Sequence, residues 1–234
     1  MRVHSPPPTP PLPRPGWSSI VTPLSLPGAA HLRTEATISL FFDIGQGAGL
    51  AGASGVRPYL PPLLAGALAR GDIGLNFSGT SYDFLASPGV LLGVFALAVL
   101  AYVLDQRRGP DTGTGRDPAS VLLAGGALVL GALLFAGSLA EGHRDSWPGL
   151  VAGVACAALG YAAVAMLFAR ARRRLEGGAA GLLSVYADGV ALALAALAIA
   201  LPPVGILALV AFAVMIVRGR AGRDRKYEGL RVLR

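Results

Sequence analysis

The sequence predicts an all-α protein, a polytopic membrane bundle of about six transmembrane helices. The 234-residue chain is 53% hydrophobic but only 14% charged, whereas a soluble domain carries roughly 25% charged residues. Its uncharged runs reach the length of about 20 residues that one helix needs to cross the hydrocarbon core. Its Arg and Lys residues gather at the ends of those runs, where membrane proteins carry their cytoplasmic anchors.

Three uncharged runs each have the length of a single crossing: Phe84–Leu104, Ala119–Ala140 and Ser146–Ala169. A fourth stretch, Gly177–Val217, holds one charged residue and as a single helix would be about 60 Å long, which is too long for one crossing. Because Pro202-Pro203 interrupts helical hydrogen bonding, this stretch predicts two spans, at residues 180–201 and 203–218.

The first apolar stretch, Ala36–Ala69, contains an interruption. As a straight helix it would be about 50 Å long. Closely spaced helix breakers occupy its middle: Gly45, Gly47, Gly49, Gly52, Gly55, Pro58, Pro61 and Pro62. They predict a break near residues 52–58, either as a kink in one span or as a re-entrant hairpin. Protein or a water-filled cavity must cover this break, because lipid does not solvate irregular backbone.

The basic residues predict which side of the bundle faces the cytoplasm. In a six-span chain, the loops after spans two and four and the C-terminus lie on one side. That side carries fourteen basic residues: Arg107, Arg108, Arg116, Arg170, Arg172, Arg173, Arg174, Arg218, Arg220, Arg223, Arg225, Lys226, Arg231 and Arg234. The opposite loops carry only Arg70 and Arg144. Cytoplasmic loops are enriched in Lys and Arg, so we expect a cytoplasmic C-terminus.

The two ends of the chain differ from the bundle, which we place at residues 35–219. Nine of the 18 prolines fall in the first 27 residues, so residues 1–34 predict a disordered, proline-rich leader. Residues 220–234 predict a basic cytoplasmic tail, which attracts anionic lipid headgroups at about 1 kcal/mol per basic side chain. Membrane lipids are therefore the expected partners, and a second copy of the chain, forming a homo-oligomer, is a further candidate.

The two halves of the chain show a faint similarity at an offset of 100 residues. Gly49-Leu50 aligns with Gly149-Leu150, and Ala96-Leu97-Ala98 aligns with Ala196-Leu197-Ala198. Three expected crossings separate the paired segments, so the two copies would form a 3+3 inverted repeat. Such repeats recur in transporters. Chance is the alternative explanation, because Ala, Gly and Leu dominate both halves.

Three ionisable residues inside apolar stretches are the candidate site. Burying a guanidinium such as Arg57 costs at least roughly 2.5–3.5 kcal/mol on insertion scales, so we expect a partner. Asp43 is the first candidate, because it lies in the same stretch. Asp188 could pair with Arg57, carry a proton or reach the interface. The predicted pathway residues are Asp43, Gly55, Arg57, Pro58, Pro61 and Asp188.

A different interpretation of these charges needs no site. Arg57 could snorkel to a headgroup region while Asp43 lies near the other surface. Enzyme signatures are also missing from the sequence, which has no GxSxG elbow, HExxH helix or Walker loop, so we expect no enzyme. Because His143 is a lone loop histidine, we expect no metal or other cofactor. The basic residues have no interleaved aromatic residues, which argues against nucleic acid as a partner.

One motif resembles a known family. The segment from Gly49 to Pro61 carries the pattern Gly-x-Arg-x-x-x-Pro at Gly55, Arg57 and Pro61, and Trp147-Pro148-Gly149 opens the fourth span. Over residues 36–234 the chain resembles the bacterial membrane-protein family "domain of unknown function 4126". The resemblance implies a membrane helix bundle in the inner membrane of a bacterial cell, and it implies no activity.

The leading functional hypothesis is a transporter or carrier of a small anionic solute or lipid headgroup. Arg57 would bind the anionic group, and Asp43 or Asp188 would counter its charge or carry a proton. The alternative is a non-transporting structural or assembly protein. In that case the glycine-rich faces would bind partner helices, and Arg57 would only hold the fold.

Overall fold

A computed structural model describes residues 28–107, 118–172 and 180–228 of the chain. These residues form seven α-helices and one short 3-10 helix, with no strand among them: α1 (Gly28–Val56), α2 (Leu60–Arg70), η1 (Asp83–Ala86), α3 (Pro88–Arg107), α4 (Pro118–Glu141), α5 (Trp147–Arg172), α6 (Ala180–Ala200) and α7 (Pro203–Glu228). The predicted all-α class is confirmed.

Three of the described helices are long and apolar enough to cross a membrane: Val121–Glu141, Trp147–Arg170 and Pro202–Arg220. Pro88–Val103 and Ser184–Ala200 are shorter apolar helices. These segments indicate a membrane protein. The long stretch with one charge is divided as predicted, since α6 ends at Ala200 and α7 begins at Pro203. Proline suits the first turn of a helix, where its missing N–H has no partner to lose.

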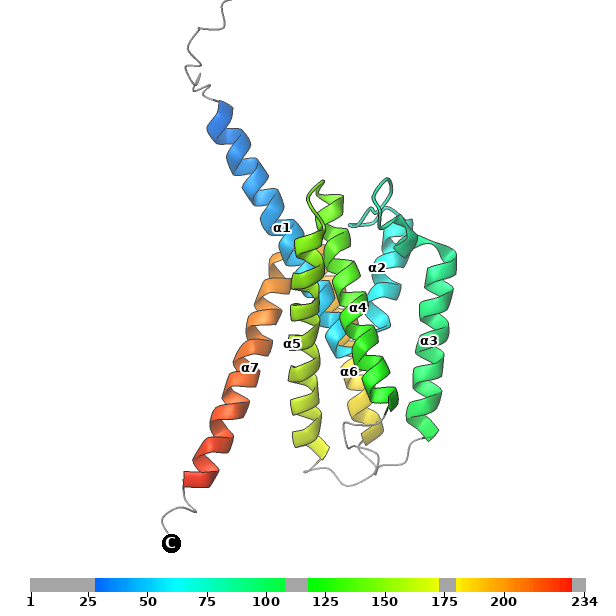
Figure 1. The fold of residues 1–234 in the computed structure, drawn as a ribbon, viewed down its shortest axis with the longest axis vertical. Coiled ribbons are helices and arrows are strands. Elements are labelled where there is room, and N and C mark those ends of the chain that lie inside the picture. The colour runs from blue at the N-terminus through cyan, green and yellow to red at the C-terminus, as the bar shows by residue number, and fades with distance from the viewer. Residues whose placement is uncertain (1–27, 108–117, 173–179, 229–234) are drawn as a thin grey trace, which may run out of the picture.

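The first apolar stretch forms a hairpin. α1 ends at Val56 and α2 begins at Leu60, with no helix at residues 57–59 between them. α2 then runs back beside α1 (Figure 1). Gln46 Nε2 of α1 donates a 3.0 Å hydrogen bond to the carbonyl oxygen of Gly74, which follows α2. Both arms therefore open towards the same end of the bundle, and residues 57–59 form the hairpin tip.

The two ends of the bundle are named here by residues of α5, the Trp147 end and the Arg170 end. The hairpin opens at the Trp147 end, which lies at the top of Figure 1. From Asp43 to Arg57, α1 extends about 20 Å at a rise of about 1.5 Å per residue. From Leu201 to Asp188, α6 also extends about 20 Å. The hairpin tip is thus deep in the bundle and nearer to the Arg170 end.

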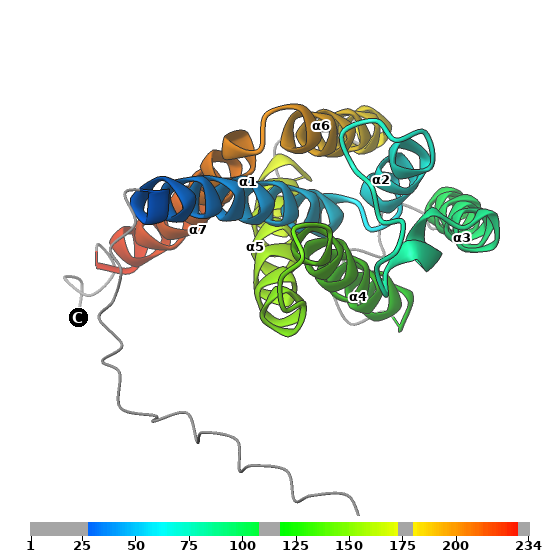
Figure 2. The ribbon, with the colours of Figure 1, turned by 90° about the horizontal axis from the view of Figure 1, so that it is seen from above.

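α1 is the central helix, and it contacts α2, α4, α5, α6 and α7. Figure 2 shows α1 between α6 on one side and the α4–α5 pair on the other, with α3 at one edge. Glycine allows this close approach. A Cβ at Gly49 would collide with Ala198 of α6, and one at Gly55 would collide with the carbonyl oxygen of Ala157 of α5. These close helix contacts of Gly49 and Gly55 occur within the chain.

The inverted repeat is not confirmed, because one aligned pair of segments lies on helices that run in the same direction, whereas the other pair, on α3 and α6, runs in opposite directions (Figure 1). Gly55 of α1 packs on Ala157 of α5, and Asp43 at the other end of this segment pairs with Arg144, just before α5. α1 and α5 therefore run in the same direction, although they carry the aligned Gly49 and Gly149. The reason is the hairpin, which adds a reversal of direction that a single kinked span would not.

The expected leader and tail overlap helices at their inner edges. α1 begins at Gly28, so residues 28–34 of the expected leader are helical, and residues 1–27 lie outside the described part of the chain. α7 continues to Glu228, so most of the expected tail, residues 220–234, is helical. Residues 229–234 lie outside the described part.

Candidate functional site

Local backbone chemistry produces the hairpin tip that carries Arg57. Arg57 N–H still donates to Ala53 O at 3.0 Å, closing the last turn of α1. Pro58 disfavours helical geometry at the residue before it and offers no N–H of its own. Pro61 lies in the first turn of α2, where proline starts a helix well. The break predicted near residues 52–58 therefore lies at residues 57–59, and residues 52–56 are still part of α1.

The Arg57 guanidinium is held by one turn of α6. Its Nε lies 2.6 Å from Asp188 Oδ1. Its Nη2 donates to the Ser184 carbonyl oxygen at 3.1 Å and also to Ser184 Oγ. The Arg57 side chain is 14% exposed and that of Asp188 is 35% exposed. The ion pair therefore joins the hairpin tip to a helix far away in sequence, and Asp188 keeps part of its surface uncovered.

Asp43 does not pair with Arg57, so the first-choice partner from the sequence is wrong. The Asp43 carboxylate lies at the base of the hairpin, where its Oδ2 is 3.8 Å from Arg144 Nε. The physical reason is that Arg57 directly follows the continuous helix that carries Asp43, which holds the two residues about 20 Å apart. Asp188 pairs with Arg57, which is one of the roles considered for it.

Sequence reasoning missed Ser184 as a ligand of Arg57. The sequence spacing could have indicated this role, because residues four apart on a helix lie on the same face and Ser184 precedes Asp188 by one turn. The other predicted pathway residues have structural positions. Gly55 allows α1 to reach α5, and Pro58 and Pro61 shape the tip. Among the described residues, Arg57, Ser184 and Asp188 therefore form the site.

The sequence of this region also decides the family. The model of the family described as "Domain of unknown function (DUF4126)" matches residues 44–220. The chain belongs to the DUF4126 family. The DUF4126 match contains the hairpin tip, Ser184 and Asp188, and it begins one residue after Asp43. No curated protein and no solved structure matches this chain.

A second cluster of polar side chains in this DUF4126 protein lies at the base of the hairpin. Arg144 Nη2 donates to Ala36 O at 2.8 Å and to Ser39 Oγ at 3.3 Å. Glu141 Oε1 accepts a 2.8 Å hydrogen bond from the Asn76 backbone N–H. The sequence suggests only an exposed turn between α4 and α5. Instead, these side chains tie the turn to α1 and to the segment after α2.

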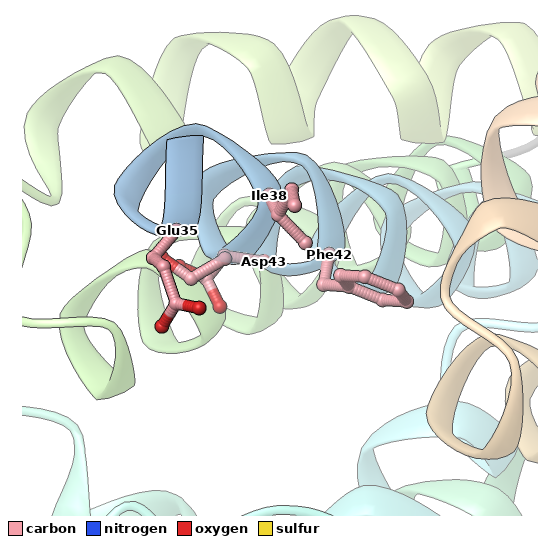
Figure 3. A pocket seen from close by; sticks show the side chains of 5 residues that line it. Glu35, Ile38, Phe42 and Asp43 are labelled. Carbon is pink, nitrogen blue, oxygen red and sulfur yellow. The ribbon is translucent and has the colours of Figure 1, made fainter. Parts of the chain in front are cut away.

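A surface depression of about 440 Å³ lies on α1 near this base. It is lined by Glu35, Ile38, Ser39, Phe42 and Asp43 (Figure 3). It is open and far from Arg57 along α1, so it is separate from the ion pair. Within the described residues, no group of three or more His, Cys, Asp and Glu side chains could hold a metal ion.

Proposed function

We propose that this DUF4126 protein is a membrane transporter or carrier of a small anionic solute or lipid headgroup, with Arg57 as its anion-binding residue. The main observation in support is the Arg57–Asp188 ion pair at the tip of a hairpin inside an apolar bundle. A guanidinium inside a membrane is expensive, and such residues line substrate pathways in many membrane proteins. Guanidinium also matches the planar geometry of carboxylate and phosphate groups.

Asp188 would act as an exchangeable counter-ion in this proposal. In the described state the Asp188 carboxylate is paired with the Arg57 guanidinium. An arriving anion would replace that carboxylate beside the guanidinium. Exchange of one carboxylate for another anion keeps the charge of Arg57 balanced at every stage, which avoids the cost of an unpaired buried charge. The 35% exposure of Asp188 supports this role, because a carboxylate exposed within a bilayer requires water.

We further propose a topology of five crossings, α3 to α7, and a re-entrant α1–α2 hairpin in place of the six expected spans. The Arg170 end would face the cytoplasm of an inner membrane. Supporting this orientation, Arg170, Arg218 and Arg220 are exposed at that end, and cytoplasmic ends are enriched in Arg and Lys. Anions would then reach Arg57 more readily from the cytoplasmic side, to which the hairpin tip is closer.

The structural alternative is supported by some of the glycines and not by others. It requires glycine-rich faces that are free to bind partner helices. Gly49 and Gly205 instead pack on each other between α1 and α7, and Gly52 packs on Gly160 of α5. These contacts use four glycines within the chain, whereas an added Cβ at Gly89, Gly93, Gly125, Gly126 or Gly189 would have nothing within 4 Å. The alternative is therefore tested as an outcome of the experiment below.

The experiment is flux in proteoliposomes, measured with radiolabelled phosphate, small carboxylates and a fluorescent anionic lipid. Wild type is compared with Arg57→Ala, Arg57→Lys and Asp188→Asn. Arg70→Ala is the control, because it removes an exposed arginine at the end of α2. We expect flux of one of these probes, at least about tenfold lower in Arg57→Ala and unchanged in Arg70→Ala, as loss of a pathway charge predicts.

Thermal unfolding in detergent separates the outcomes. Equal flux in wild type and Arg57→Ala would remove Arg57 from the pathway. No flux of any probe in wild type, together with a lower midpoint in Arg57→Ala, would support the structural alternative. Retained activity in Arg57→Lys would show that a positive charge suffices, whereas its loss would assign the function to the guanidinium fork.

A further inference from the structure

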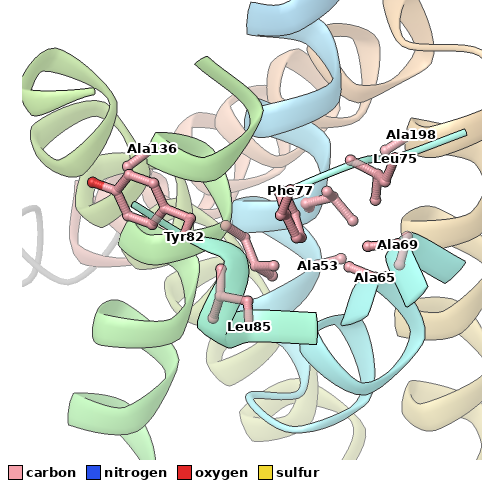
Figure 4. Close-up of a cluster of buried hydrophobic side chains, with 12 residues drawn as sticks. Ala53, Ala65, Ala69, Leu75, Phe77, Tyr82, Leu85, Ala136 and Ala198 are labelled. Carbon is pink, nitrogen blue, oxygen red and sulfur yellow. The ribbon is translucent and has the colours of Figure 1, made fainter. Parts of the chain in front are cut away.

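The connection between α2 and α3 is folded into the bundle at the Trp147 end. Residues 71–82, called the plug loop, place Leu75 and Phe77 in the main hydrophobic cluster at 2% and 1% exposure. Figure 4 shows both side chains among residues of the surrounding helices, including Ala53 and Ala198. Leu75 and Phe77 therefore complete a core that the helices alone leave open.

The plug loop touches three helices around the hairpin. Gly74 lies against Ile199 of α6, and the Phe77 ring lies against Gly137 of α4. Gln46 of α1 donates to Gly74 O. The loop thus fills the position between α1, α4 and α6 at the end to which the hairpin opens. Arg57 is deeper in the bundle, on the side of the loop away from the Trp147 end.

Two side chains from other helices hold the loop in place, and they are called the latches. Gln46 Nε2 donates to Gly74 O at 3.0 Å, and Glu141 Oε1 accepts from the Asn76 N–H at 2.8 Å. Each latch holds a backbone group of the loop rather than a side chain. The Gln46 latch is part-buried, so its loss would leave a part-buried polar group without its partner. The Glu141 latch is exposed to solvent.

The backbone of the plug loop is suited to movement as a unit. Asp72, Gly74 and Gly79 have φ angles of 53°, 71° and 78°, so left-handed residues occur at both ends of the segment that carries Leu75 and Phe77. Asp is one of the few non-glycine residues that adopt this conformation readily. Because Leu75 and Phe77 are not on a helix, they can leave the core without unwinding one. Segments with solvent-exposed backbone hydrogen bonds are common sites of local opening, and opening here must draw Leu75 and Phe77 out of the core.

We infer that the plug loop is a gate at the Trp147 end, held closed by Gln46 and Glu141 and opened by release of these latches. The gate covers the hairpin from the side opposite to the Arg170 end. Its opening would connect the Arg57 tip to the Trp147 side, so the bundle is closed at that end in the described state. This inference concerns the motion of the loop and does not require transport of any solute.

Cysteine labelling tests the gate directly. The only native cysteine, Cys156, is replaced by Ser, and the protein is placed in lipid nanodiscs, where both faces meet the solvent. Leu75→Cys measures the solvent access of the buried part of the plug loop. Ile73→Cys, at a position that is 60% exposed, gives the rate for a fully accessible position. The rate of reaction with a water-soluble maleimide is measured for each, alone and combined with Gln46→Ala or Glu141→Ala.

We expect Leu75→Cys alone to react at least about tenfold more slowly than Ile73→Cys, and each latch substitution to raise its rate about tenfold or more, as local opening predicts. Asp145→Ala, which removes an exposed carboxylate from the same turn as Arg144, should leave the rate unchanged. Unchanged rates in both latch variants would overturn the gate, as would rapid reaction of Leu75→Cys without them.

A second reporter distinguishes opening from unfolding. Ala163 of α5 is fully buried and lies outside the cluster that contains Leu75. Ala163→Cys should stay unreactive in the latch variants if only the loop moves. Equal acceleration at Ala163→Cys and Leu75→Cys would mean that the latches merely stabilise the fold, and it would also overturn the gate. None of these rates depends on flux, so the gate and the proposed transport function fail separately.

Discussion

Arg57 Nε lies 2.6 Å from Asp188 Oδ1, which joins the tip of the α1–α2 hairpin to α6. The two residues come from opposite halves of the chain, and the nearer carboxylate in sequence, Asp43, is bound elsewhere. Ser184 supplies two more acceptors to the same guanidinium. These contacts join the hairpin tip to one turn of α6.

Asp188→Asn should lower the stability of the fold. The substitution removes the negative charge and leaves the mostly buried Arg57 guanidinium without its ion-pair partner. Because Asp188 is 35% exposed, we expect a loss of about 1–3 kcal/mol, below the value for a fully buried pair. Thermal or denaturant unfolding in detergent measures it. The double variant Arg57→Met with Asp188→Leu should recover part of the loss, and a larger loss in the double variant would contradict the pairing.

Ser184→Ala should destabilise through Arg57 rather than through α6. Arg57 Nη2 loses the hydroxyl acceptor and keeps the carbonyl of the same residue, so we expect a loss of about 0.5–1.5 kcal/mol. In a double-mutant cycle with Asp188→Asn the two losses should not add, because the residues share a partner. Ser138→Ala is the control, since its hydroxyl bonds only within α4, to Leu134 O. Additive losses for Ser184 would argue against a shared guanidinium.

Gly55→Ala should be destabilising although alanine favours helices. An added Cβ would collide with the Ala157 carbonyl oxygen, and overpacking of this kind costs about 1–3 kcal/mol. The matched control is Gly93→Ala on α3, where an added Cβ has no neighbour within 4 Å. There we expect a gain of up to about 1 kcal/mol from helix propensity. Similar unfolding midpoints for the two variants would contradict the close α1–α5 contact.

Side-specific labelling should place the start of α1 and the end of α7 on opposite sides of the membrane. With Cys156 replaced by Ser, Ser39→Cys and Arg220→Cys introduce reporters at exposed positions. In intact cells, a membrane-impermeant maleimide should label Ser39→Cys and reach Arg220→Cys only after lysis, because the basic end faces the cytoplasm. Labelling of both before lysis, or of neither, would instead fit a first stretch that crosses the membrane once.

Replacing Arg144 by Ala should loosen the first part of α1. Arg144 holds Ala36, Ser39 and Asp43, whereas α1 beyond Gln46 is packed inside the bundle. Hydrogen exchange should therefore become faster at residues 36–43, while residues 46–56 stay protected, as expected for a local opening. Arg70→Ala, at an exposed position on α2, is the control. Faster exchange throughout α1 would show that Arg144 supports the whole helix.

Local chemistry made several features predictable. Charge-free runs marked α3, α4 and α5, because a run without ionisable groups must be buried in protein or lipid. Pro202-Pro203 marked the turn between α6 and α7, since proline cannot continue the hydrogen bonds of the preceding helix. The break at Arg57 was marked by Gly55, Pro58 and Pro61 for the same reason. Each signal acts within a few residues of the feature that it predicts.

The partners of the charged residues depended on packing between distant segments. A short separation in sequence favoured Asp43 for Arg57, but a rigid helix between them keeps them apart, and the hairpin brings Arg57 to Ser184 and Asp188 instead. Leu75 and Phe77 stand among Gly, Asn, Ser and Asp, a composition typical of an exposed turn. The sequence alone determined a membrane bundle of apolar helices with a broken first stretch, because hydrophobicity and proline act locally. Only the tertiary structure decided the direction of α2, the Asp188 pairing and the burial of the plug loop, because these depend on which helices meet.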